Sequence, residues 1–201
     1  RLLADKRREE ADLVYALLLE SRTEAVAAGL VLLSRGDALS GLTVRYLCDL
    51  ASSDVPAAMS ASLLASVLSG PSFDDRVKRH AIVRIGDRAD GSLREPLLNL
   101  ATDPTRESNL RIAALKAATS KWPPECHSTL VRLLRSAQEP IMHHKAQQYL
   151  ALSGHPDALT LIEEFVLNRD PATSGTSLSK EYGLLLLRFR KGDAVVPLLT
   201  S

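Results

Sequence analysis

Two short stretches of the chain, Glu125–Cys126–His127 and Met142–His143–His144, bring together residue types that bind transition metals. Zinc sites usually contain short-range ligand pairs such as CxxC or HExxH, and neither pattern occurs in this sequence. Each pair is expected to begin a different helix of roughly 20 Å. Because the second of these helices follows the first along the chain, its start should lie at the opposite rim of the fold, and the two pairs should be far apart. The sequence therefore predicts structural roles for these residues, with no metal and no cofactor.

Catalytic motifs are also missing from the sequence. Serine, histidine and aspartate are all present, but no GxSxG or similar spacing ties them into a nucleophilic triad. The glycines fall where helices are expected to end, as in "SGP" and "KGD", and they form no phosphate-binding loop. We therefore expect a chain that is not an enzyme.

A basic side chain recurs at regular intervals in the middle of the chain. The positions are Arg45, Lys78, Arg111 and His143. One interpretation is a row of cations that binds phosphate. The other, which we favour, is that each begins a helix and bonds to a neighbouring carbonyl or loop carboxylate, such as Asp75 or Asp103.

The elements that hold these residues follow from a repeat. The phrase "NLRIAALKAA" at 109–118 returns as "VRYLCDLASS" from Val44 and "VKRHAIVRIG" from Val77, with a period of about 33 residues. Counted from Leu110, and from Val44 and Val77 in the other two copies, the fifth position of the phrase is small in four of six copies. In chain order this position holds Tyr15, Cys48, Ala81, Ala114, Ala146 and Tyr182. Since small residues allow close packing of helices, we predict that the alanines are buried.

A second helical pattern lies between successive copies of the phrase. Its apolar residues recur at helical spacing, as in Leu130, Leu133 and Leu134. Proline falls near the starts of these second helices, and Thr23, Asp54 and Ser177 are predicted N-caps. No segment alternates long enough to indicate a strand. The pattern predicts about twelve helices in six antiparallel pairs, near residues 4–36, 40–70, 73–103, 105–137, 139–169 and 177–201.

The segments "VKRHAIVRIGDRADGSLREPLLNLATD" and "LRIAALKAATSKWPPECHSTLVRLLRS" resemble HEAT repeats of the short bacterial type. The resemblance covers roughly residues 40–170 and implies an all-α solenoid, residues 1–201 forming one repeat domain. Such proteins mostly bind other proteins along the concave surface of their second helices, while some bind DNA or modify bases. Base-excision members need a carboxylate beside an aromatic-walled pocket, and Trp122 with Glu125 supplies only one aromatic residue.

The expected binding surface follows from the second helices. Residues opposite each apolar stripe should form a concave lane that binds a partner protein or peptide. The lane comprises Ser62, Ser66, Ser69, Glu95, Asn99, Thr102, Ser128, Arg132, Arg135, Thr160, Glu164 and Leu167. The alternative is nucleic-acid binding or a HEAT-like DNA-modifying protein, and residues 76–135 hold twelve Lys or Arg against six Asp or Glu. A continuous positive groove on the concave face would favour that alternative, whereas a mixed polar lane there favours protein binding.

Composition limits the class of protein further. The 201 residues carry 25 Lys or Arg and 24 Asp or Glu, and a net charge of +1 argues against a generally polyanion-binding surface. No apolar run approaches the roughly 20 residues of a membrane span. Two cysteines form no disulfide framework, which is compatible with a cytoplasmic protein. The chain starts without Met and stops in an apolar segment, so we expect a piece of a longer protein.

Overall fold

The computed structural model describes residues 21–36, 39–122, 124–136, 139–153 and 155–167, and all of its regular structure is helical. In these ranges there are nine α-helices, two short 3₁₀ helices and no strand. The all-α prediction is therefore confirmed for the described residues. The expected helices before residue 21 and after residue 167 lie outside them, as do Tyr15, Tyr182 and Ser177.

The helices follow one another in the predicted order. They are α2 (Arg22–Ser34), α3 (Gly41–Ala51), α4 (Ala57–Ser69), α5 (Asp75–Ile85), η1 (Gly86–Arg88), η2 (Gly91–Leu93), α6 (Arg94–Thr102), α7 (Ser108–Lys121), α8 (His127–Ser136), α9 (Pro140–Leu152) and α10 (Ala158–Leu167). The first helices of the pairs, α3, α5, α7 and α9, begin at Gly41, Asp75, Ser108 and Pro140. Their starts are thus almost evenly spaced along the chain.

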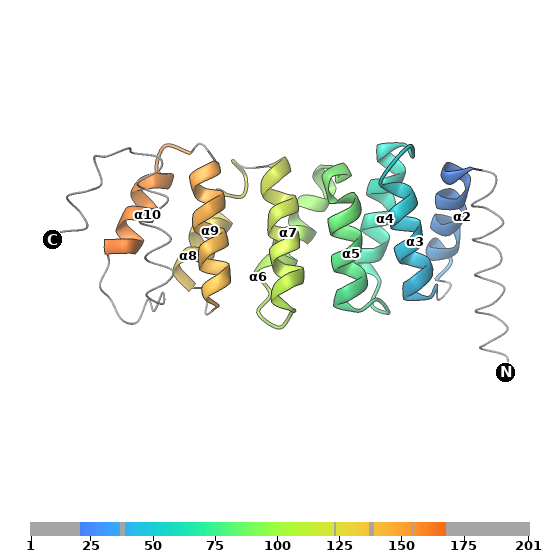
Figure 1. Ribbon diagram of the computed structural model, residues 1–201, viewed down its shortest axis with the longest axis horizontal. Coiled ribbons are helices and arrows are strands. Elements are labelled where there is room, and N and C mark those ends of the chain that lie inside the picture. The colour runs from blue at the N-terminus through green and yellow to red at the C-terminus, as the bar shows by residue number, and fades with distance from the viewer. Residues whose placement is uncertain (1–20, 37–38, 123, 137–138, 154, 168–201) are drawn as a thin grey trace. The chain divides into compact units, whose positions relative to one another are not determined.

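Contacts divide the chain into two compact units, Arg1–Ala117 and Ala118–Ser201, with the boundary inside α7. In the first unit α3 packs against α5, and α2 packs against α4 (Figure 1). The loop between α3 and α4 is short, and these two helices also contact each other. One pair of first helices, α3 and α5, and one pair of second helices, α2 and α4, therefore lie side by side in this unit. In the second unit α9 contacts both α8 and α10.

Local capping explains where several helices begin. Ser21 accepts a hydrogen bond from the Glu24 amide at 3.5 Å, and Asp74 accepts one from the Val77 amide at 2.9 Å. Such caps satisfy amides that have no partner inside the helix. Two predicted caps are wrong. Thr23 lies inside α2, because Ser21 is the residue that caps it, and Asp54 precedes the actual α4 cap residue, Pro56.

The repeated small position lies in the core. Cys48, Ala81, Ala114 and Ala146 are each 0% exposed, which confirms the predicted burial of the alanines. Gly29 of α2 provides a further close approach that the pattern did not reveal. A Cβ built there would lie 2.4 Å from Cδ1 of Leu47, which is itself buried in α3. Glycine at this point allows α2 and α3 to pack closely.

Candidate functional site

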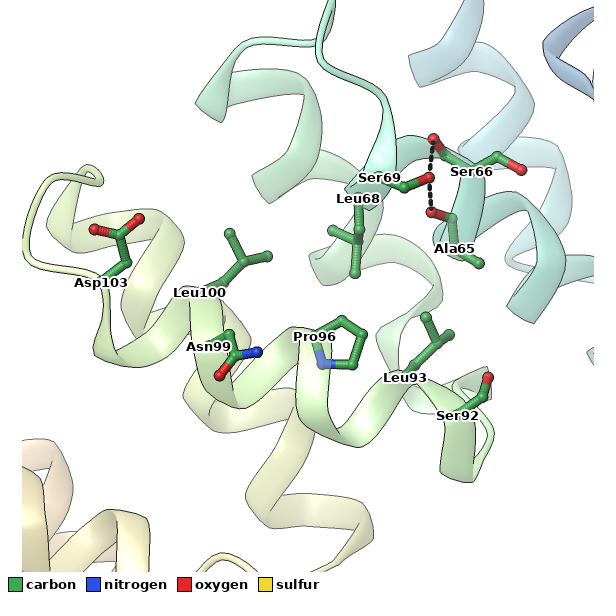
Figure 2. A pocket seen from close by; sticks show the side chains of 10 residues that line it. All are labelled: Ala65, Ser66, Leu68, Ser69, Ser92, Leu93, Pro96, Asn99, Leu100 and Asp103. Atoms are coloured by element: carbon green, nitrogen blue, oxygen red, sulfur yellow. Dashed lines mark hydrogen bonds between the residues drawn. The ribbon is translucent and has the colours of Figure 1, made fainter.

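Part of the predicted lane in the first unit borders a cavity of about 550 Å³. Ser66 and Ser69 of α4 line one side, and Asn99 of α6 lines the other. Figure 2 shows Leu68 of α4 pointing into the space, with Pro96 and Leu100 across from it on α6, while the Ser69 hydroxyl points back to carbonyls of its own helix. Three of the six lane residues of this unit are therefore brought together. Ser62, Glu95 and Thr102 do not line the cavity.

Most of the cavity wall is apolar or neutral. Leu68 and Leu93 are 9% and 3% exposed, so each turns a largely buried side chain toward the opening. Leu100 and Pro96 complete the apolar wall from α6. We call this set of residues, together with Ala65, Ser66, Ser69, Ser92, Asn99 and Asp103, the α4–α6 cavity. The sequence pattern missed the leucines because it assigned them to the buried stripe.

The three serines of the lane on α4 already donate their hydroxyl protons within the helix. Ser66 Oγ donates to the Ser62 carbonyl at 3.0 Å, and Ser69 Oγ donates to the Ala65 carbonyl at 2.9 Å. Ser62 and Thr102 bond in the same way to carbonyls four residues earlier, at 2.9 and 3.0 Å. These hydroxyls can accept hydrogen bonds from a ligand, but they are poorly placed to donate.

Asp103 is the one charged residue of the α4–α6 cavity. Its carboxylate accepts hydrogen bonds from the Thr105 hydroxyl at 2.7 Å and the Thr105 amide at 2.9 Å. Arg106 Nε donates to it at 3.3 Å. The Thr105 hydroxyl is the largest of the causes that hold the pKa of Asp103 below its ordinary value. The cavity therefore carries one fixed negative charge at its rim.

The second-unit half of the lane lies on α8 and α10, which contact each other. Its members, all at least partly exposed, are Ser128, Arg132, Arg135, Thr160, Glu164 and Leu167. Leu167 is a large apolar side chain that is 46% exposed. Arg132 and Arg135 give α8 a positive outer edge, whereas Glu164 is acidic. These positions are on the surface as expected, and their joint action remains a prediction.

The recurring basic position is buried in three of its four copies. Arg111 is only 4% exposed, and its Nε donates to the Ala101 carbonyl at 3.3 Å, as the structural interpretation expects. Lys78 and His143 are 6% and 4% exposed. Burial is the main cause that lowers the pKa of Lys78, followed by the nearby charge of Arg106. Arg45 differs, because it is exposed.

The carboxylates expected to bind these basic residues have another partner. Arg106 Nη1 lies 3.0 Å from Asp75 Oδ1, and Arg106 Nε lies 3.3 Å from Asp103 Oδ2. Sequence analysis missed Arg106 because it lies in the turn before α7, outside the recurring helical phrase. A second arginine so close before Arg111 was the one sequence feature that could have indicated another partner for these carboxylates.

The cysteine and histidines of the two stretches 125–127 and 142–144 are at least partly buried. Cys126 is 0% exposed, and the His127 ring stacks on His155 with 3.6 Å between ring centroids. His143 meets Phe165 edge-on, with centroids 5.5 Å apart. No group of three or more His, Cys, Asp or Glu side chains suited to a metal ion occurs in the described ranges. Neither Cys48 nor Cys126 forms a disulfide in the part of the chain that the structure describes.

Trp122 is half-buried after α7, and its carbonyl accepts a hydrogen bond from the Cys126 amide at 3.1 Å, while Glu125 is exposed.

Over the part of the chain that the structure describes, no helix combines the length and hydropathy that a membrane span requires. No family model, curated protein or solved structure matches the chain.

Proposed function

We propose that this chain is a HEAT-like helical repeat protein that binds a partner polypeptide on its second helices, without catalysing a reaction. The repeat part of the proposal is supported by the almost even spacing of the first-helix starts, at Gly41, Asp75, Ser108 and Pro140. It is also supported by like-with-like packing of α2 on α4 and α3 on α5 in the first unit. Stacked helix pairs of this kind make an α-solenoid.

The observation that carries the binding function is the α4–α6 cavity. About 550 Å³ of space, walled by leucine and proline and edged by small polar side chains, suits one or two apolar side chains of a peptide. Asn99 is exposed at its edge and offers both an amide donor and an acceptor to a peptide backbone. A mostly neutral wall with one carboxylate, Asp103, is poorly suited to a polyanion.

Peptide display gives a direct test. The purified chain is immobilised and challenged with a random peptide library, and the affinity of a selected peptide is measured by fluorescence anisotropy. We expect enrichment of peptides with apolar anchors. Ser69→Trp fills the cavity from α4 and should weaken their binding by roughly tenfold or more, which corresponds to about 1.4 kcal/mol.

Ser62→Trp is the matched control. Ser62 and Ser69 are both exposed serines on α4 with hydroxyls bonded four residues back, but only Ser69 lines the cavity. Retained binding in Ser62→Trp and loss in Ser69→Trp places the anchor in the cavity. Loss in both extends the contact along the predicted lane. Equal binding of both variants and the wild type would end the proposal, as would failure to enrich any peptide.

A further inference from the structure

A second surface of the first unit gathers cations from three helices. A groove of about 460 Å³ is lined by Arg45 of α3, by Arg76, Arg79 and His80 of α5, and by Lys116 of α7. It shares no residue with the α4–α6 cavity, because it lies on the first helices of the pairs. We call it the basic groove.

Three of its arginines are available to a ligand. Arg45, Arg76 and Arg79 are exposed, and the structure gives them no hydrogen bond or ion pair within the ranges it describes. The neighbouring carboxylate, Asp49, is already shared: His80 Nε2 lies 3.0 Å from its Oδ1, and Arg84 Nε lies 2.6 Å from the same oxygen. The groove therefore has an uncompensated positive charge, although the whole chain has a net charge of only +1.

Part of the groove lining is apolar. Val83 of α5 is 69% exposed, and Ile112 and Ala113 of α7 line the groove beside it. Val83 offers contact to an apolar group in the same groove whose arginines can bind anions. None of the lining residues of the groove has an aromatic ring other than the His80 imidazole. Base stacking, which single-stranded nucleic-acid sites use, is thus weakly supported.

The size of the groove sets the length of its ligand. Packed helices lie about 8–10 Å apart, so the path from α3 across α5 to α7 is roughly 16–20 Å. An extended peptide covers about 3.3–3.6 Å per residue, and about five or six residues would therefore span it. Guanidinium groups bind carboxylates through two parallel hydrogen bonds, which favours aspartate or glutamate side chains in that segment.

From these features we infer that the basic groove binds a short acidic segment of a partner protein. Its carboxylates lie against Arg45, Arg76 and Arg79, and an apolar side chain between them lies against Val83. This site is separate from the one in the proposed function, and either can fail alone. The two sites would let the first unit hold a partner from both layers of helices.

The test uses the full chain and a fluorescein-labelled peptide of alternating Glu-Glu-Leu triplets, with fluorescence anisotropy as the readout. The same peptide with Gln for Glu measures the contribution of charge. We expect binding of the Glu peptide that weakens as salt is raised, and little binding of the Gln peptide. An oligo-thymidine strand and phosphatidylserine vesicles are measured in parallel.

Charge reversal locates the site. The double variant Arg76→Glu/Arg79→Glu should weaken binding of the Glu peptide by roughly tenfold or more. Arg35→Glu/Lys121→Glu is the matched control, since it reverses two exposed cations that do not line the groove and changes the net charge equally. That control should stay within about twofold of the wild type. Val83→Asp, at a position where 69% exposure tolerates substitution, should also weaken binding.

Each outcome decides the inference. Unchanged binding in Arg76→Glu/Arg79→Glu and in Val83→Asp overturns it, as does equal weakening in Arg35→Glu/Lys121→Glu. Tighter, Arg76- and Arg79-dependent binding of oligo-thymidine or vesicles would replace the acidic segment with that anion. Ser69→Trp should leave binding of the Glu peptide unchanged, so failure of the α4–α6 cavity and failure of the basic groove are told apart.

Discussion

Arg106 Nη1 donates a hydrogen bond to Asp75 Oδ1 at 3.0 Å, across 31 residues of sequence. The other carboxylate oxygen of Asp75 accepts the Glu107 amide at 3.1 Å. Asp75 lies in the first turn of α5, and its side chain is 17% exposed. One carboxylate therefore joins the start of α5 to the turn that precedes α7.

Removing this carboxylate should destabilise the fold. Asp75→Ala leaves the Glu107 amide without its acceptor and removes one partner of Arg106, so we expect a loss of about 1–2 kcal/mol in urea unfolding. Asp54→Ala is the control, because the Arg22–Asp54 pair has the same 3.0 Å distance but the Asp54 side chain is 87% exposed. Its unfolding midpoint should be unchanged. Equal effects of the two changes would mean that Asp75 acts as an ordinary surface charge.

Enlarging the repeated small position should overpack the core. Ala114 is 0% exposed in α7, so Ala114→Leu adds three carbons where no space remains, and we expect a loss of roughly 1–3 kcal/mol. The measurement is again the urea midpoint. Ala58→Leu makes the same change at an exposed position of α4 and should have little effect. An unchanged midpoint in Ala114→Leu would show that the surroundings relax around the larger side chain.

The C-terminus of α2 depends on a left-handed residue. Gly36 has a φ of 76°, and its amide donates to the Leu33 carbonyl at 3.1 Å. Alanine strains this conformation by roughly 1–2 kcal/mol, whereas asparagine tolerates it better. We expect a lower melting temperature for Gly36→Ala and a smaller decrease for Gly36→Asn.

Gly91→Ala controls for the loss of glycine itself. Like Gly36 it has no heavy atom near a built Cβ, but its φ is not positive. Alanine there should be neutral or slightly stabilising, since it restricts the unfolded chain. If Gly36→Ala and Gly91→Ala change the melting temperature equally, backbone conformation is not the reason for Gly36.

The sequence was a good guide to helices and to close contacts. Small residues that recur once in each repeat identify places where helix backbones approach, and Cys48, Ala81, Ala114 and Ala146 are all fully buried. It also predicted correctly that Arg111 bonds to a carbonyl rather than facing solvent. These features depend on local periodicity, which one chain displays directly.

Features that depend on the spacing between helices were not predicted. Leu68 and Leu100 occupy ordinary positions of an apolar stripe, and nothing in their spacing indicates that a cavity opens between α4 and α6. The basic groove is similar, because Arg45 and Lys116 lie far apart in sequence and approach only through the packing of the first helices. Hydropathy identifies the face of a helix, but not the gap to its neighbour.

The thiol of Cys48 should be inert in the folded protein. Burial raises its pKa to about 12, with the charge of Asp49 as a second cause, and its side chain is 0% exposed. At pH 8 the thiolate fraction would be about one in ten thousand, so disulfide exchange is slow. In Cys126→Ser, Ellman's reagent should react slowly until urea unfolds the chain. Rapid stoichiometric reaction under native conditions would mean that α3 opens readily.

Acid should weaken the second unit through the stacked pair His127 and His155. Burial lowers the pKa of His127 from its ordinary value of 6.5, and the charge of His155 adds to this decrease. The unfolded state therefore binds a proton more readily than the folded state does. The stabilisation is fully present above about pH 6.5 and is lost as the pH falls through the lowered pKa. We expect the melting temperature to fall over that window.

In His127→Gln the curve of melting temperature against pH should start lower at pH 8, because the ring contact is lost, but it should decline less steeply on acidification. Parallel curves for the wild type and the variant would show that His127 does not titrate differently on folding.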